Sequence, residues 1–212
     1  MNFATILQGP ALYLLTNHDN KTQEKLFDDV ELALSGGVKI LQYRDKSDDQ
    51  EKRLREASGL KKLTQRYRAM LIINDDINLA RNVEADGVHL GQDDGDIATA
   101  RQKLGEQAII GVSCYNDLAR ARQAAKANAS YLAFGRFFPS RTKPNAKPAD
   151  TMLIAEARQF TDLPIVAIGG ITPENAQPLV KAGVNMIAVI DAVFGQADIA
   201  QAIEQFNRTL TR

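Results

Sequence analysis

Short apolar segments alternate along the chain with longer segments in which apolar residues recur at helical spacing. The short segments are rich in β-branched and aromatic residues, and they are continuously apolar rather than alternating with polar positions. That pattern is typical of parallel strands buried on both faces. It predicts strands over residues 12–15, 38–43, 70–74, 87–90, 108–113, 131–134, 164–168 and 186–190.

A segment of helical period follows each predicted strand. Helix stop signals support these segments, since Gly36 and Gly37 follow the first and Gly183 follows the seventh. Eight strand–helix units predict an α/β fold in the form of one (β/α)8 TIM barrel domain over residues 1–212. An open doubly wound sheet is the alternative, because the repeat alone does not require closure. The predicted helices cover residues 22–34, 49–66, 77–82, 96–104, 117–127, 151–159, 173–182 and 199–210.

Composition narrows the classes of partner. Lys and Arg together number 26, as do Asp and Glu, so no net charge attracts nucleic acid or an anionic membrane. No run approaches the roughly 18 consecutive apolar residues of a membrane span. The lone Cys114 cannot form an internal disulfide and is typical of a reducing compartment. We therefore expect a cytoplasmic protein that binds small molecules.

Unusual polar residues follow the predicted strands, where a parallel barrel gathers its chemistry at one mouth. After the second strand, Gln42, Arg44 and Lys46 project to the same side because side chains alternate along a strand. Arginine can bind phosphate through two parallel N–H bonds, and lysine adds a compact charge. A solvated strand end is the alternative, but the position at the mouth favours phosphate binding.

Acidic residues follow the next two strands. We expect Asp76 to cap the short helix at 77–82 and Asp75 to face the mouth. A second carboxylate, from Asp93 or Asp94 after the fourth strand, would complete a pair of oxygen ligands. Such a pair suits Mg²⁺, which typically takes one or two carboxylates together with phosphate oxygens and water. Cysteine and histidine are too few for a zinc site.

The last three strand ends suit phosphate. Hydroxyls and cations alternate at residues 140–143, and the absence of Cβ atoms at Gly169 and Gly170 lets backbone N–H groups approach an anion. The chain has two histidines and no Ser–His–Asp set, Walker A loop or dinucleotide motif. The predicted chemistry is therefore electrostatic: cations stabilise the negative charge that develops on a departing phosphate.

Seven segments in this order resemble the thiamine-phosphate synthase (thiamine-phosphate pyrophosphorylase) family. They are GGVKILQYRDK, IINDD, ADGVHLGQDD, GVSCYN, FGRFFPSRTKP, VAIGGI and AVIDAVF. The resemblance implies a (β/α)8 transferase of thiamine biosynthesis with Mg²⁺ as cofactor. It would condense 4-amino-2-methyl-5-(diphosphooxymethyl)pyrimidine with thiazole phosphate, giving thiamine phosphate and pyrophosphate. The implied route is dissociative: pyrophosphate leaves first, and the thiazole nitrogen captures the pyrimidine cation.

The resemblance also implies roles for individual residues. Gln42, Arg44 and Lys46 would hold the diphosphate, with Arg44, Lys46 and Lys143 assisting its departure. Asp75 and Asp94 would coordinate Mg²⁺. The implied pyrimidine contacts are Asn74 and Ser113, and the implied thiazole-phosphate contacts are Ser140, Arg141, Thr142, Gly170, Ile190 and Asp191.

Three positions depart from the family pattern. Arg136 stands where a small residue or proline is common, Ser140 where threonine is usual, and Asp191 where serine is common. A carboxylate beside a phosphate is unfavourable, so only the backbone N–H of Asp191 is expected to serve there.

Two other functions stay open. A thiazole tautomerase-like relative would share the barrel without needing a magnesium–diphosphate site, and a non-catalytic phosphate-binding barrel could lose the acids altogether. The retention of both acidic motifs favours the synthase. The amphipathic helices leave a homo-oligomer possible.

Overall fold

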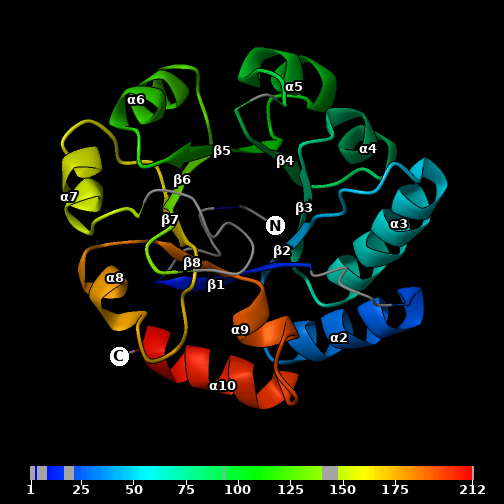
Figure 1. The fold of residues 1–212 in the computed structure, drawn as a ribbon. Coiled ribbons are helices and arrows are strands. Elements are labelled where there is room, and N and C mark those ends of the chain that lie inside the picture. Colours follow the sequence, from blue (N-terminus) through cyan, green and yellow to red (C-terminus); the bar gives the residue numbers. More distant parts are fainter. Residues whose placement is uncertain (1–2, 4–8, 17–21, 93, 140–147, 212) are drawn as a thin grey trace.

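The barrel predicted from the repeat is closed. The computed structural model describes residues 3, 9–16, 22–92, 94–139 and 148–211. Within them, eight parallel strands run in the order β1 to β8, and β1 is hydrogen-bonded to β8 (Figure 1). The TIM barrel is confirmed and the open sheet is excluded. The strands are β1 (Ala11–Leu15), β2 (Ile40–Tyr43), β3 (Met70–Asn74), β4 (Gly87–Leu90), β5 (Ile109–Tyr115), β6 (Tyr131–Gly135), β7 (Ile165–Ile168) and β8 (Met186–Val189).

Helices surround the strands as an outer ring (Figure 1). No helix in the described part of the chain is long and apolar enough to cross a membrane. The helices are α2 (Gln23–Ser35), α3 (Gln50–Arg66), α4 (Ile77–Asn82), α5 (Ile97–Leu104), α6 (Leu118–Lys126), α7 (Met152–Arg158), α8 (Gln177–Lys181), α9 (Asp191–Phe194) and α10 (Ile199–Leu210).

Several elements differ from the prediction, and β2 begins at Ile40 rather than at residue 38. The helix α9 was not predicted, because four residues are too few to display a helical period. The strand β5 runs two residues beyond its expected end, with a register shift between Ser113 and Tyr115. The helix expected from residue 173 begins only at 177. The Asn175 side chain explains the delay: it accepts from Thr172 N and donates to the carbonyl of Gly170, holding a turn there.

The strands are buried on both faces, as their continuous apolar pattern predicted. In β2, Leu41 packs outward against the helices, whereas Ile40 belongs to the cluster inside the barrel. The inner cluster also contains Tyr13, Ile72 and Val166, from three further strands. Each strand therefore has one side for anchoring to the helices and one side for the barrel interior.

Aspartates begin several helices just after the mouth of the barrel. Asp76 Oδ1 accepts from Leu79 N at 2.9 Å and caps α4, as predicted. Asp49, Asp96, Asp117 and Asp198 cap other helices in the same way. A cap of this kind stabilises a helix by about 1 kcal/mol and fixes the point at which the chain leaves the mouth.

A methyl group at Gly111 should destabilise the barrel interior. An ideal Cβ there would lie 1.9 Å from Cζ of Tyr131, whose ring would have to move. We expect Gly111→Ala to lower the free energy of unfolding by about 1–3 kcal/mol in urea denaturation, because overpacking a core is costly. Gly9→Ala is the control, since no atom of the described residues lies within 4 Å of the position that its Cβ would take. Equal stability of the two variants would contradict the packing described.

Candidate active site

A cavity of about 390 Å³ opens at the C-terminal ends of the barrel strands. Its walls combine apolar side chains of the barrel interior, such as Val166 and Ile168, with polar groups at the strand ends. It therefore lies where a parallel barrel carries its chemistry. Of the residues predicted from the sequence, those that line it are Gln42, Arg44, Asn74, Ser113, Gly170, Ile190 and Asp191.

The other predicted residues fall into two groups. Lys46, Asp75 and Asp94 form a charged cluster beside the cavity, which they join through Asn74. Ser140, Arg141, Thr142 and Lys143 lie outside the described residues.

A chain of neutral hydrogen bonds crosses the cavity from β2 to β5. Gln42 Nε2 donates to Tyr13 Oη at 2.8 Å, and the two hydroxyls of Tyr13 and Tyr131 are 2.8 Å apart. His89 Nδ1 lies 2.9 Å from Tyr131 Oη, and its Nε2 lies 2.9 Å from Ser113 Oγ. Five strands thus contribute to one connected network whose two ends are residues predicted to contact substrate.

The order of donors along this network follows from its burial. Burial raises the pKa of both Tyr13 and Tyr131, so each keeps its proton. Tyr13 Oη accepts from Gln42, so its own hydroxyl proton is directed to Tyr131. The hydroxyl proton of Tyr131 is then directed to His89 Nδ1. His89 is then neutral, with its proton on Nε2 directed to Ser113. Gln42 Oε1, buried and without a hydrogen-bond partner in the described structure, is left as an acceptor for a ligand.

Sequence reasoning did not single out Tyr131, and it left the roles of Tyr13 and His89 open, with the pyrimidine pocket as one place for them. Tyr13 and Tyr131 lie inside apolar strands, where an aromatic residue most often belongs to the core. His89 was interpreted as a packed or hydrogen-bonded strand residue, and it is hydrogen-bonded. The only signal in the sequence was that each side chain has a polar tip at a position that alternation assigns to the barrel interior.

The two predicted carboxylates meet beside the cavity. Burial, followed by the hydrogen bond and the negative charge of Asp75, raises the pKa of Asp94. The N–H of Gly91 donates to Asp94 Oδ2 at 2.9 Å, and Lys46 pairs with Asp75 Oδ2. Asp75 itself adopts a left-handed backbone with φ of 65°, which is uncommon for a residue other than glycine and is typical of functional sites.

This cluster offers oxygen ligands for a hard cation. Two acids held in hydrogen-bonding range repel each other when both are ionised, and a divalent cation would relieve that repulsion. Across the described part of the chain, no group of three or more His, Cys, Asp or Glu residues has the arrangement of a metal site. Asp75 and Asp94 would therefore supply two ligands, which is the number that Mg²⁺ commonly takes from a protein.

Arginines bring positive charge to the cavity wall. Arg44 and Arg136 both line it, from the ends of β2 and β6. The peptide of Arg44 is fixed by Thr16, whose Oγ1 accepts from Arg44 N at 2.9 Å. Asp191 lies at the start of α9 in the same wall. The cavity thus combines anion-binding cations with one opposing carboxylate.

The glycine pair after β7 has a packing role that the sequence did not predict. A Cβ on Gly169 would lie 2.2 Å from Cβ of Arg136, and one on Gly170 would lie 2.2 Å from the carbonyl oxygen of Pro139. Their φ angles are 103° and 64°. The absence of side chains here lets the segment after β6 lie directly against the segment after β7.

The comparisons with known proteins agree with this geometry. A family profile described as "Thiamine monophosphate synthase" matches residues 12–193. The thiamine-phosphate synthase of Nitrosococcus oceani is 50% identical over 93% of this chain and 91% of its own. That of Alcanivorax borkumensis is 49% identical over 94% of this chain and 92% of its own. The solved thiamine phosphate pyrophosphorylase of Pyrococcus furiosus is 34% identical, with a TM-score of 0.85 over 94% of both chains.

Cys114 should be unreactive in the folded protein. It is fully buried, and burial raises the pKa of its thiol to about 12, so almost none is thiolate at pH 8. We expect a chromogenic thiol reagent to react about a hundredfold more slowly with the native protein than with the urea-unfolded protein. Similar rates in the two states would show that the thiol is accessible.

Proposed function

The chain belongs to the thiamine monophosphate synthase family and is an enzyme of thiamine biosynthesis, and from this premise we propose the reaction in detail. The proposed substrates are 4-amino-2-methyl-5-(diphosphooxymethyl)pyrimidine and thiazole phosphate. The bond between the pyrimidine methylene carbon and the diphosphate oxygen breaks first, and its electron pair leaves with pyrophosphate. The thiazole nitrogen then donates its lone pair to the pyrimidine cation, giving thiamine phosphate.

The observation that carries this proposal is the meeting of a carboxylate pair and cations beside a cavity that contains a chain of neutral hydrogen-bonding groups. Lys46 pairs with Asp75, which contacts Asp94, and Arg44 lines the adjoining wall. A diphosphate bridging this cluster would leave its heterocycle next to the hydrogen-bonding chain from Gln42. Such an arrangement supports a charged leaving group on one side and a neutral ring on the other.

We assign the charged half of the substrate to the β2–β4 side. Gln42, Arg44 and Lys46 would hold the diphosphate, while Asp75 and Asp94 would hold Mg²⁺. Magnesium, when bound, would neutralise charge on the departing pyrophosphate. Arg44 and Lys46 would donate hydrogen bonds to the same oxygens, and the family resemblance adds Lys143 to them. These hydrogen bonds would be strongest in the transition state, when negative charge develops on the departing pyrophosphate, and so would lower the barrier to its departure.

The heterocycles would occupy the cavity. Asn74 and Ser113 are proposed to contact the pyrimidine, and the neutral chain ending at Ser113 suits an uncharged ring. A nitrogen nucleophile with a free lone pair needs no deprotonation, so no general base is required. The proposed thiazole-phosphate contacts are Ser140, Arg141, Thr142, Gly170, Ile190 and Asp191, with Asp191 serving through its backbone N–H.

Two alternatives belong to the same barrel. A thiazole tautomerase-like activity would need no paired acids, and a non-catalytic binder would need no strained Asp75. The contact between Asp75 and Asp94 favours the synthase over both. Location in the cytoplasm stays part of the proposal, consistent with the lone Cys114. Self-association through helical faces stays an expectation.

The test is to mix the purified protein with both phosphorylated heterocycles and Mg²⁺ and to measure thiamine phosphate. Product should form with Mg²⁺ and should be absent when the metal is chelated. No product under either condition would count against the synthase. Conversion of a thiazole tautomer without the pyrimidine substrate would favour the tautomerase.

Asp75→Asn should abolish most turnover at ordinary Mg²⁺. The amide keeps the shape of the side chain but removes one of the two metal-binding charges, and we expect a loss of about a hundredfold in kcat/KM. Asp28→Asn, on the exposed face of α2, is the matched control. Circular dichroism should give similar melting curves for both. Unchanged turnover in Asp75→Asn would remove this residue from the metal site.

A further inference from the structure

Two loops of the charged cluster are tied to the same turn of one helix. Lys52 Nζ lies 2.9 Å from Asp45 Oδ2, in the loop that carries Arg44 and Lys46. The next residue, Arg53, places Nη2 2.9 Å from Asp76 Oδ2, beside Asp75. Consecutive residues near the start of α3 therefore reach the strand ends of β2 and β3. No role in substrate binding accounts for these contacts.

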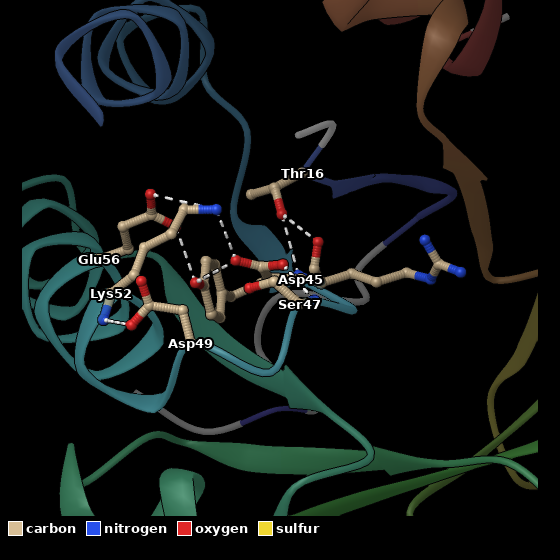
Figure 2. A network of polar contacts seen from close by, with 8 residues as sticks. Thr16, Asp45, Ser47, Asp49, Lys52 and Glu56 are labelled. Atoms are coloured by element: carbon tan, nitrogen blue, oxygen red, sulfur yellow. Dashed lines mark hydrogen bonds and ion pairs between the residues drawn. The ribbon is translucent and has the colours of Figure 1, made fainter. Parts of the chain in front are cut away.

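The first tether fixes the loop after β2 from behind. Asp45 lies between the two cations in sequence, and its side chain is only 4% exposed because it turns toward α3. It accepts from the backbone N–H of Ser47 at 2.8 Å as well as from Lys52. Figure 2 shows this network, with Asp45 and Ser47 facing Lys52, Asp49 and Glu56. Thr16 holds the same loop from its other side.

The partners of Lys52 keep it charged and in place. Its hydrogen bond to Asp45 is the main cause that raises the pKa of its ammonium group. Its Nζ also lies 4.0 Å from Glu56, which is buried. Tyr43 donates to Glu56 Oε2 at 2.8 Å, and burial together with this carboxylate raises the pKa of Tyr43. Lys52 therefore keeps its charge and Tyr43 keeps its proton.

The second tether fixes the loop after β3. Asp76 accepts from Leu79 N through Oδ1 while its Oδ2 pairs with Arg53, so both of its oxygens are engaged. The neighbouring residue, Asp75, holds its left-handed conformation immediately before this anchored point. Strained backbone persists only where its surroundings hold it, and the Arg53–Asp76 pair is such a restraint. Lys46 then joins the two tethered loops through Asp75.

We propose that Lys52 and Arg53 are positioning residues, and that the first turns of α3 set the spacing between the cations Arg44 and Lys46 and the carboxylate of Asp75. This inference rests on the proposed function for the nature of the ligand, a magnesium-bound diphosphate. Neither residue touches the ligand. Each acts by holding a loop whose inward side chains do.

Lys52→Met tests the first tether, with Arg55→Met on the same helix as control. Arg55 is 59% exposed and pairs only weakly with Glu51, so its loss should change nothing. We expect Lys52→Met to raise the KM for the pyrimidine diphosphate and the Mg²⁺ concentration at half-maximal rate by about tenfold, as loss of a supporting partner does at metal sites. The KM for thiazole phosphate should stay unchanged. Lys52→Arg should restore most of the loss.

Arg53→Met tests the second tether. It also provides an independent test of the inference if Lys52→Met does not fold. The Arg53 side chain is mostly buried, and methionine is chosen because it retains an unbranched apolar stem at this position. We expect Arg53→Met to raise mainly the Mg²⁺ concentration at half-maximal rate, because Arg53 holds Asp76, the residue next to Asp75. Folding of every variant is checked by thermal melting.

Calorimetric binding of magnesium pyrophosphate separates this inference from the proposed reaction. The wild-type protein could bind magnesium pyrophosphate and still make no thiamine phosphate. In that case, about tenfold weaker binding of the probe by both variants would support the positioning role although the proposed reaction had failed. Wild-type affinity in both variants would overturn the inference. The inference would also be overturned if the wild-type protein did not bind magnesium pyrophosphate, or if the lower activity of the variants were explained by a smaller folded fraction.

Discussion

Two carboxylates held in contact are the constraint on which the site depends. Asp75 and Asp94 repel each other when ionised, and burial together with the hydrogen bond and charge of Asp75 raises the pKa of Asp94. The N–H of Gly91, the side-chain amide of Asn74 and the ammonium of Lys46 compensate part of that charge. The chain nevertheless holds the two acids together, with Asp75 in a costly backbone conformation. In the proposed function, a divalent cation would relieve this repulsion and would in turn favour a polyanionic substrate.

Barrel closure lets this charged cluster adjoin the chain of neutral hydrogen-bonding groups in the cavity. The acids come from loops after β3 and β4, whereas the hydroxyl and imidazole chain runs through β1, β6, β4 and β5. Because the strands are parallel, their ends all meet at one mouth however far apart they lie in sequence. In the proposed reaction the charged cluster would stabilise the leaving group while the neutral chain would orient a ring, and neither would need a proton-transfer base.

The sequence was most informative about position along the strands and least informative about outward-facing partners. All eight strands and the residues at their ends were predicted, since burial on both faces and parallel topology leave clear patterns. Tyr131 was missed because an aromatic residue inside a strand resembles core. Lys52 and Arg53 were missed because charges near a helix start are usually solvated. Their contacts depend on tertiary distances that no local pattern records. The roles of residues 140–143 rest on their alternating hydroxyls and cations and on the family resemblance.

Strand alternation explains why the support for the site lies where it does. Gln42 and Arg44 line the cavity and Lys46 pairs with Asp75. The side chains between them, Tyr43 and Asp45, contact Glu56 and Lys52 of α3 and so anchor the loop without occupying substrate space. A polar anchor directed into the helix layer must be paired, because an uncompensated buried carboxylate is costly. Lys52 meets that requirement for Asp45. The buried ionic network behind β2 is thus a consequence of having cations in front of it.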